Sequence, residues 1–141
     1  MQDLSCIFCK IAAGQIPARM VKQNDAAMAF LDAFPLAAGH TLVIPKSHYA
    51  RVQDMGVQDA AAVFSLVHEI AGRVEAAAGA TASTIAVHNG KDAGQEVMHV
   101  HVHIIPRKPG DGAGPVNSMF KNSRPKLSAQ EMDSLAAKMA G

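Results

Sequence analysis

The 141-residue sequence contains no tryptophan, one tyrosine, 4% aromatic residues and only two cysteines. Two cysteines close together cannot build the disulfide framework of a small secreted domain. No apolar run is long enough to cross a membrane, and residues 1–5 carry no secretory signal. The net charge of +1 gives no long-range attraction to a nucleic acid polymer or to an anionic membrane. We therefore expect a soluble cytoplasmic protein that binds neither a nucleic acid polymer nor a membrane.

Hydrophobic periodicity predicts an α+β fold. Apolar residues recur at three- and four-residue steps over 57–78, which predicts one long helix. Short strands are expected over 19–22, 27–31, 41–44, 83–87 and 99–105, with a short helix over 6–13, a loop over 109–118 and a last helix beginning at Ser128. We expect a single domain over 1–141, an antiparallel meander of about five strands with the long helix packed on it. Residues 108–141 form its C-terminal loop and short helix.

Three histidines alternate with β-branched residues at 99–105. In a strand this spacing places His99, His101 and His103 on one face. Imidazoles titrate, bind metals and attack electrophiles near neutral pH. The row could therefore be a catalytic metal site, a nucleophile acting on phosphorus, or a solvated strand face. The strict period of two favours a functional site.

Cys6 and Cys9 form a Cys-x-x-Cys motif, which is typical of a redox pair or of half a zinc site. A redox motif normally follows a strand, and no segment before Cys6 is long enough to form one. Zinc requires two further ligands, and histidine is abundant here. The residues favour zinc over a redox pair, and an inert pair is the third alternative.

Several segments around the histidines support a family resemblance. The run His-x-His-x-His with two following apolar residues resembles the signature of the histidine triad (HIT) family of nucleotide-binding hydrolases and transferases. Other segments similar to the family lie, in the expected order, at 6–11, 14–17, 29–32, 35–40, 42–48 and 93–95. The resemblance covers about residues 5–107. It implies a HIT-like fold, a nucleotide substrate (a purine nucleoside phosphate is expected) and a homodimer.

The resemblance also implies a mechanism. His101 would attack the α-phosphorus of a nucleoside phosphoramidate or dinucleoside polyphosphate, and water would then hydrolyse the covalent nucleotidyl-histidine. His103 would hold phosphate oxygens or pass a proton to the leaving group. Asp32 would accept hydrogen bonds from the ribose, and backbone N–H groups of the 90–94 turn could hold phosphate. The other expected substrate-binding residues are Ile7, Phe8, Ile16, Phe30 and Ala33 for the base, and His88, Gly94, Gln95 and Glu96 near the phosphate. For the apolar ones, ordinary core packing is the alternative.

For the cysteines, the resemblance to bacterial members implies a structural zinc site. Its ligands would be Cys6, Cys9, His48 and His99, which leaves no position for water. His99 would then take no part in the chemistry.

Two residues depart from the family pattern. His88 stands where the family usually carries an amide, which would make binding more sensitive to pH. Glu96 stands where well-studied branches carry Ser or Thr near the leaving group, which puts the transfer of their leaving-group preference in doubt. His40 would support the triad.

The rival function is a nucleotide-binding regulatory protein with vestigial turnover.

Overall fold

The computed structural model describes residues 2–120 and 124–141. The chain divides into two compact units, Met1–Asp111 and Gly112–Gly141. The first unit contains the sheet, the hydrophobic core and all the residues considered above as site residues. No helix among the described residues is long and apolar enough to cross a membrane.

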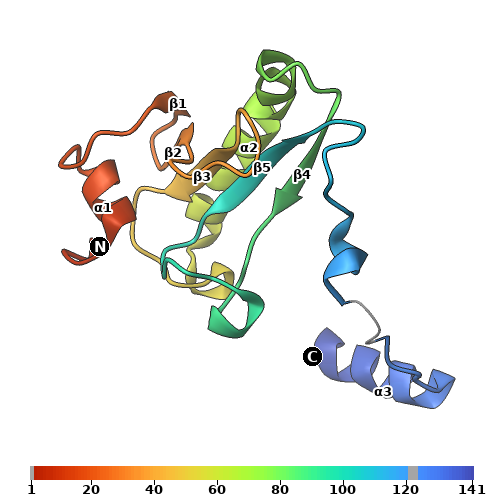
Figure 1. Cartoon of the computed structure of the whole chain (residues 1–141). Helices are drawn as coiled ribbons and strands as arrows, with labels where there is room; N and C mark the ends of the chain where they lie inside the picture. The colour runs from red at the N-terminus through yellow and green to blue at the C-terminus, as the bar shows by residue number, and fades with distance from the viewer. Residues whose placement is uncertain (1, 121–123) are drawn as a thin grey trace. The chain divides into compact units, whose positions relative to one another are not determined.

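The first unit is built on one antiparallel sheet of five strands (Figure 1). Its strands are β1 (Met20–Gln23), β2 (Ala27–Leu31), β3 (Thr41–Pro45), β4 (Ala82–Ala86) and β5 (Val102–Arg107). They lie in the order β1-β2-β3-β5-β4, so β5 is inserted between β3 and β4. The expected five-stranded antiparallel sheet is confirmed, but its order is not that of a simple meander. The long helix between β3 and β4 carries the chain to the far edge, and β5 then returns to the middle.

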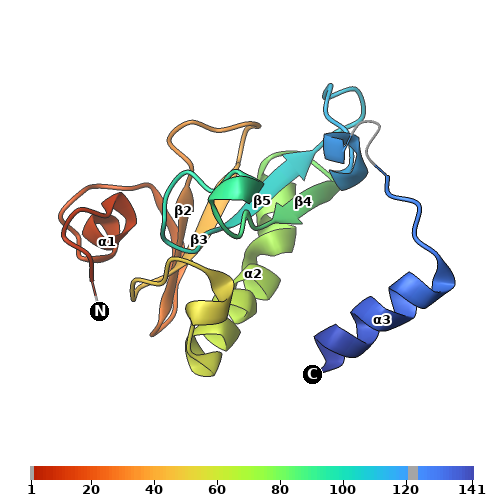
Figure 2. The ribbon, with the colours of Figure 1, turned by 90° about the horizontal axis from the view of Figure 1, so that it is seen from below.

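Two hydrophobic clusters cover the two faces of the sheet. The long helix α2 (Val57–Ala77) packs its buried Leu66 and Ile70 against Val43, Val102 and Ile104. On the opposite face, the short helix α1 (Ile7–Ala12) contributes to a second cluster; its members are Cys6, Phe8, Cys9, Met28, Phe30, Leu42 and Ile44. Figure 2 shows the strands between α1 and α2. The alternation of β2 and β3 therefore supplies both faces with apolar residues.

The histidine segment is the main correction to the expected strands. β5 begins at Val102, so His99 and His101 precede the strand and only His103 lies within it. The backbone before β5 makes other bonds: Val100 N–H donates to the Tyr49 carbonyl at 2.7 Å. The His99 carbonyl accepts a hydrogen bond from the ring of His101 at 2.8 Å instead of entering the sheet.

The second unit contains the 3-10 helix η3 (Val116–Phe120) and the helix α3 (Ala129–Ala140). η3 extends into the segment expected to be a loop. Ser128 caps α3, because its hydroxyl accepts the N–H of Glu131 at 3.1 Å. Every described residue of this unit is exposed.

Candidate functional site

A cavity of about 570 Å³ opens between α1, the ends of β2 and β3, and the histidine segment. Its floor is apolar, with Phe30 and Leu42 from the sheet and Phe8 from α1. Of the residues expected to bind substrate, these line it: Ile7, Phe8, Ile16, Phe30, Asp32, Ala33, His88, Gly94 and Glu96. His101 and His103 also line it. The sequence reasoning missed several lining residues, among them Arg19 and Val97, which no local motif marks, and Leu42, which has the pattern of an ordinary apolar strand residue.

His101 is buried, and its ring is fixed at one nitrogen. The carbonyl of His99 can only accept, so Nδ1 of His101, 2.8 Å away, carries the hydrogen. In the neutral ring this leaves the lone pair on Nε2. Phe8 packs edge-on against the ring, with a centroid distance of 5.2 Å. His101 therefore has the tautomer that a nucleophile requires.

A chain of hydrogen bonds fixes the tautomer of His103 as well. The N–H of Leu36 donates to Nδ1 of the buried His40 at 3.1 Å, so a neutral His40 carries its hydrogen on Nε2. That Nε2 lies 2.9 Å from Nδ1 of His103 and donates to it. The hydrogen of His103 is then on Nε2, a buried atom with no hydrogen-bond partner in the described parts of the chain. His103 thus offers an unused donor beside His101, whose ring centroid is 5.0 Å away.

The surroundings favour the neutral forms of these histidines. Burial is the largest of the effects that together lower the pKa of His103 to about 4; the neighbouring imidazoles of His101, His40 and His88 act in the same direction, and the negative charge of Asp32 acts against them. Burial also lowers the pKa of His101, while the negative charges of Asp32 and Glu96 act in the opposite direction. For His40, burial lowers the pKa and Asp32 partly offsets it. Near neutral pH these rings are therefore uncharged.

Asp32 follows β2 at the rim of the cavity. One carboxylate oxygen accepts the N–H of Phe34 at 2.9 Å, which closes a local turn. The other oxygen lies 3.6 Å from Nε2 of His40. The side chain is partly exposed and lines the cavity, so its carboxylate could accept a hydrogen bond from a hydroxyl-bearing ligand.

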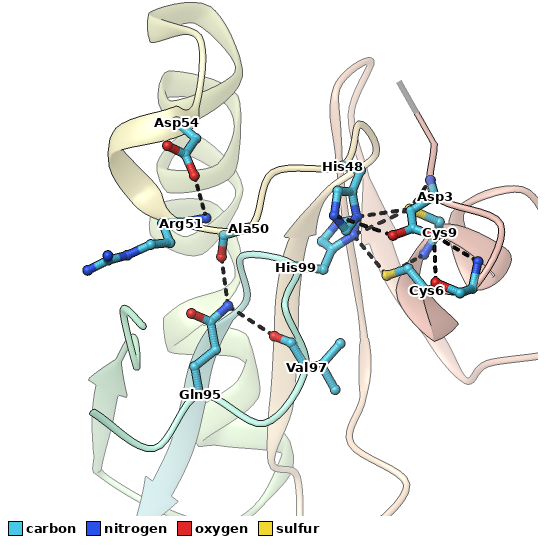
Figure 3. A network of polar contacts seen from close by, with 11 residues as sticks. Asp3, Cys6, Cys9, His48, Ala50, Arg51, Asp54, Gln95, Val97 and His99 are labelled. Carbon is cyan, nitrogen blue, oxygen red and sulfur yellow. Dashed lines mark hydrogen bonds and ion pairs between the residues drawn. The ribbon is translucent and has the colours of Figure 1, made fainter. Parts of the chain in front are cut away.

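Gln95 was expected to bind substrate, but it does not line the cavity, which corrects that expectation. Its amide is used within the protein: Oε1 accepts from Gly90 N–H at 2.8 Å, and Nε2 donates to the carbonyls of Ala50 at 2.7 Å and Val97 at 3.0 Å. Figure 3 shows the last two contacts. The side chain ties the loop before the histidines to the segment after His48.

The glycine turn also differs from the expected phosphate cradle. The N–H of Gly90 is bonded to the Gln95 side chain, and the N–H groups of Ala93, Gly94 and Gln95 donate to carbonyls inside the turn. These four groups therefore hold the turn together and are not available to phosphate. Gly90 and Gly94 have φ values of +107° and +94°, which explains glycine at both positions.

The cysteines and two histidines form a compact cluster (Figure 3). The possible ligand atoms of Cys6, Cys9, His48 and His99 all lie within 4.8 Å of one another. Nδ1 of His99 is 3.4 Å from Sγ of Cys6 and 3.6 Å from Sγ of Cys9, and Nδ1 of His48 is 3.4 Å from Sγ of Cys9.

This arrangement fits a tetrahedral zinc ion. Zn–S bonds of about 2.3 Å and Zn–N bonds of about 2.0 Å place neighbouring ligand atoms roughly 3.5 Å apart. His99 Nε2 lies 2.8 Å from the Pro45 carbonyl, which must accept, so Nδ1 carries the lone pair that faces the thiols. Burial lowers the pKa of His99 to about 4 and raises the pKa of Cys9. A cation would supply the charge that two buried thiolates need.

Comparison with known proteins identifies the class of protein. The profile of the HIT domain matches residues 13–110. The chain belongs to the HIT family, as the sequence resemblance implied.

Three curated relatives illustrate the similarity. An uncharacterized HIT-like protein of Methanocaldococcus jannaschii is 46% identical over 109 residues, which are 76% of this chain and 82% of the relative. The adenosine 5'-monophosphoramidase hnt1 of Schizosaccharomyces pombe is 40% identical over 79% of this chain and 80% of its own length. The adenylylsulfatase HINT3 of Arabidopsis thaliana is 37% identical over 84% of this chain, but the match spans only 60% of that longer protein.

Solved structures agree in fold. A HIT family protein of Bacillus anthracis has a TM-score of 0.86 and 36% identity, with 97% of this chain and 96% of that chain covered. A zinc-bound histidine triad family protein of Mycobacterium smegmatis has a TM-score of 0.70 and 32% identity, with 97% and 94% covered.

Proposed function

We propose that this protein is a nucleotide hydrolase that acts at the α-phosphorus of nucleoside phosphoramidates or dinucleoside polyphosphates. The observation that carries the proposal is the pair of complementary tautomers, a lone pair on Nε2 of His101 beside an unused N–H on Nε2 of His103. A nucleophile and a hydrogen-bond donor facing one cavity are what transfer of a phosphorus group requires. The names of the phosphoramidase and adenylylsulfatase relatives agree with this class of reaction.

In the first step, Nε2 of His101 attacks the α-phosphorus and the bond from phosphorus to the leaving group breaks. Because Nδ1 keeps its hydrogen, the modified ring carries a positive charge, which the His99 carbonyl stabilises. His103 donates its Nε2 hydrogen to a phosphate oxygen. The leaving group departs with the electron pair of the broken bond and takes up a proton from solvent.

In the second step, water attacks the phosphorus and the P–N bond to His101 breaks. The nucleoside monophosphate is released, the water proton is lost to solvent, and the lone pair returns to Nε2 of His101. Asp32 binds the ribose hydroxyls during both steps, and the apolar floor with Phe8 and Phe30 contacts the base. A purine, which has the larger aromatic surface, suits this floor.

The cluster of Cys6, Cys9, His48 and His99 would hold a structural zinc ion. Bound there, zinc would supply no reaction step; it would join α1 to the segment before β5. The consequence for catalysis is positional, because the carbonyl of His99 orients the ring of His101. His99 thus belongs to the zinc cluster through its ring and to the active site through its backbone.

The test is hydrolysis of adenosine 5'-phosphoramidate and of a dinucleoside polyphosphate by wild type and His101→Ala. We expect the variant to lose at least about 1000-fold in kcat, since no other ring has the same geometry. Quenching the wild-type reaction with labelled nucleotide should trap one nucleotide on His101. Wild-type nucleotide binding without turnover would instead support the rival regulatory function. Equal rates of hydrolysis for both proteins would overturn His101 as the nucleophile.

A further inference from the structure

The cavity contains few fixed charges, and most of them are negative. Among the described residues that line it, the ones with permanent charge are Arg19, Asp32 and Glu96. The cavity therefore carries one negative charge in excess, although its proposed substrate is itself an anion.

Arg19 and Asp32 lie at the same end of the cavity. The carbonyl of Arg19 accepts the N–H of Leu31 at 2.9 Å, and Leu31 directly precedes Asp32. Their opposite charges offset each other at the end where the nucleoside binds. Glu96 has no such partner, and it makes no ion pair with the described residues.

Glu96 is held in place by its neighbours along the chain. The residue before Glu96 is Gln95, whose side chain is hydrogen-bonded within the protein. The residue after it is Val97, whose carbonyl accepts a hydrogen bond from that same side chain. The side chain is exposed at the cavity wall. Its negative charge acts on the ring of His101, so it lies within electrostatic reach of the reacting phosphorus.

We propose that Glu96 is a specificity residue that selects the leaving group by charge. It favours a leaving group that carries a protonated amine and disfavours an anionic one such as a sulfate or a second nucleotide. The nucleoside occupies the apolar floor and the Asp32 end, so the leaving group is left with the open part of the cavity, where Glu96 stands unpaired. This inference rests on the proposed function and narrows its substrate class to phosphoramidates over polyphosphates.

The experiment compares three adenosine 5'-phosphoramidates that share the P–N bond and differ in one remote charge. They are the amidates of 1,3-diaminopropane (cationic), propylamine (neutral) and β-alanine (anionic). For wild type at low salt, we expect kcat/KM to be about tenfold higher for the cationic than for the anionic compound. In Glu96→Gln this ratio should fall to about twofold or less.

The matched control is Asp92→Asn, which removes an exposed carboxylate from the same loop but outside the cavity. It should keep the wild-type ratio. If Glu96→Gln is inactive on all three compounds, the salt dependence of the wild-type ratio is the test. Selection by the charge of Glu96 predicts that this ratio falls toward one between about 20 and 500 mM salt, the range over which screening acts.

The two proposals fail in different ways. A Glu96→Gln ratio equal to that of wild type, with His101→Ala inactive, overturns the selection by Glu96 and leaves the hydrolase intact. Absence of wild-type hydrolysis of all three compounds, or full activity of His101→Ala, overturns the proposed function and this inference with it.

Discussion

At the scale of single residues, His103 is a histidine whose protonation the fold opposes. The groups that face it are the imidazoles of His40, His88 and His101 and the carboxylate of Asp32. Its Nδ1 accepts from His40, so a second proton would have to break that bond. Burial and this bond act together to keep the ring neutral.

This neutrality makes stability depend on pH. In the unfolded chain a histidine titrates near its ordinary pKa of about 6.5, whereas burial lowers the pKa of His103 in the folded state to about 4. Between these values the unfolded state binds a proton that the folded state does not. The free energy of unfolding therefore falls as pH falls from about 6.5 to 4 and gains nothing from this residue above pH 6.5.

Urea denaturation at intervals between pH 4 and pH 7.5 measures this dependence. We expect His103→Gln to lose less stability than wild type over the window, while His68→Gln, on the exposed face of α2, should follow wild type. Parallel curves for wild type and His103→Gln would contradict the assignment.

At the scale of elements, α1 is the helix that depends most on its surroundings. It has six residues, too few to be stable alone, and its first-turn N–H at Cys9 points to the sulfur of Cys6 at 3.5 Å. Phe8 and Cys9 attach it to the sheet, and the cluster with His48 and His99 attaches it to the histidine segment. Metal binding would thus hold this face of the fold together.

We expect one zinc per chain in wild type and none in Cys9→Ala. Loss of the metal should lower the unfolding temperature by about 10 °C or more, because the second apolar cluster then loses its anchor. Lys10→Ala, a change in the same helix outside the cluster, should keep both the zinc and the unfolding temperature. Metal analysis and differential scanning calorimetry with and without a chelator measure this, and an unchanged unfolding temperature after full chelation would refute a structural role.

At the scale of the whole molecule, the two units differ in how they are stabilised. Met1–Asp111 contains the complete sheet, both apolar clusters and the cavity. Gly112–Gly141 contains no buried residue among those described, and its helix α3 has twelve residues. Helices of this length are marginal in water without packing.

A chain that ends after Asp111 is therefore expected to retain the fold, the zinc and the hydrolysis of the neutral propylamine amidate within about threefold of wild type. Circular dichroism should show loss of helical signal equivalent to α3 only. Cooperative unfolding lost on truncation would show that Gly112–Gly141 contributes to the core of the first unit. The full-length chain, purified in parallel, is the reference.

Much of this fold was predictable because its elements are locally encoded. The apolar period of α2, the apolar run of β2 and the β-branched run of β3 place those elements within a residue or two of their expected bounds. The histidine strand was predicted too early, because the alternation of His99 and His101 suits a strand equally well. Only tertiary hydrogen bonds show that these residues precede the strand: Val100 N–H donates to the carbonyl of Tyr49, and the His99 carbonyl accepts from the ring of His101.

The sequence by itself determined which groups are candidates for the proposed chemistry, since the spacing of the histidines and cysteines and the HIT resemblance follow from local order along the chain. Tertiary structure decided how those groups are used. Leu36 and His40 are more than sixty positions from His103, and their hydrogen bonds determine its tautomer. The side chain of Gln95 is hydrogen-bonded within the protein, so Glu96 and not Gln95 lies at the exposed wall of the cavity. Hydrogen-bond direction and burial depend on partners that are far apart in sequence, so no motif can express them.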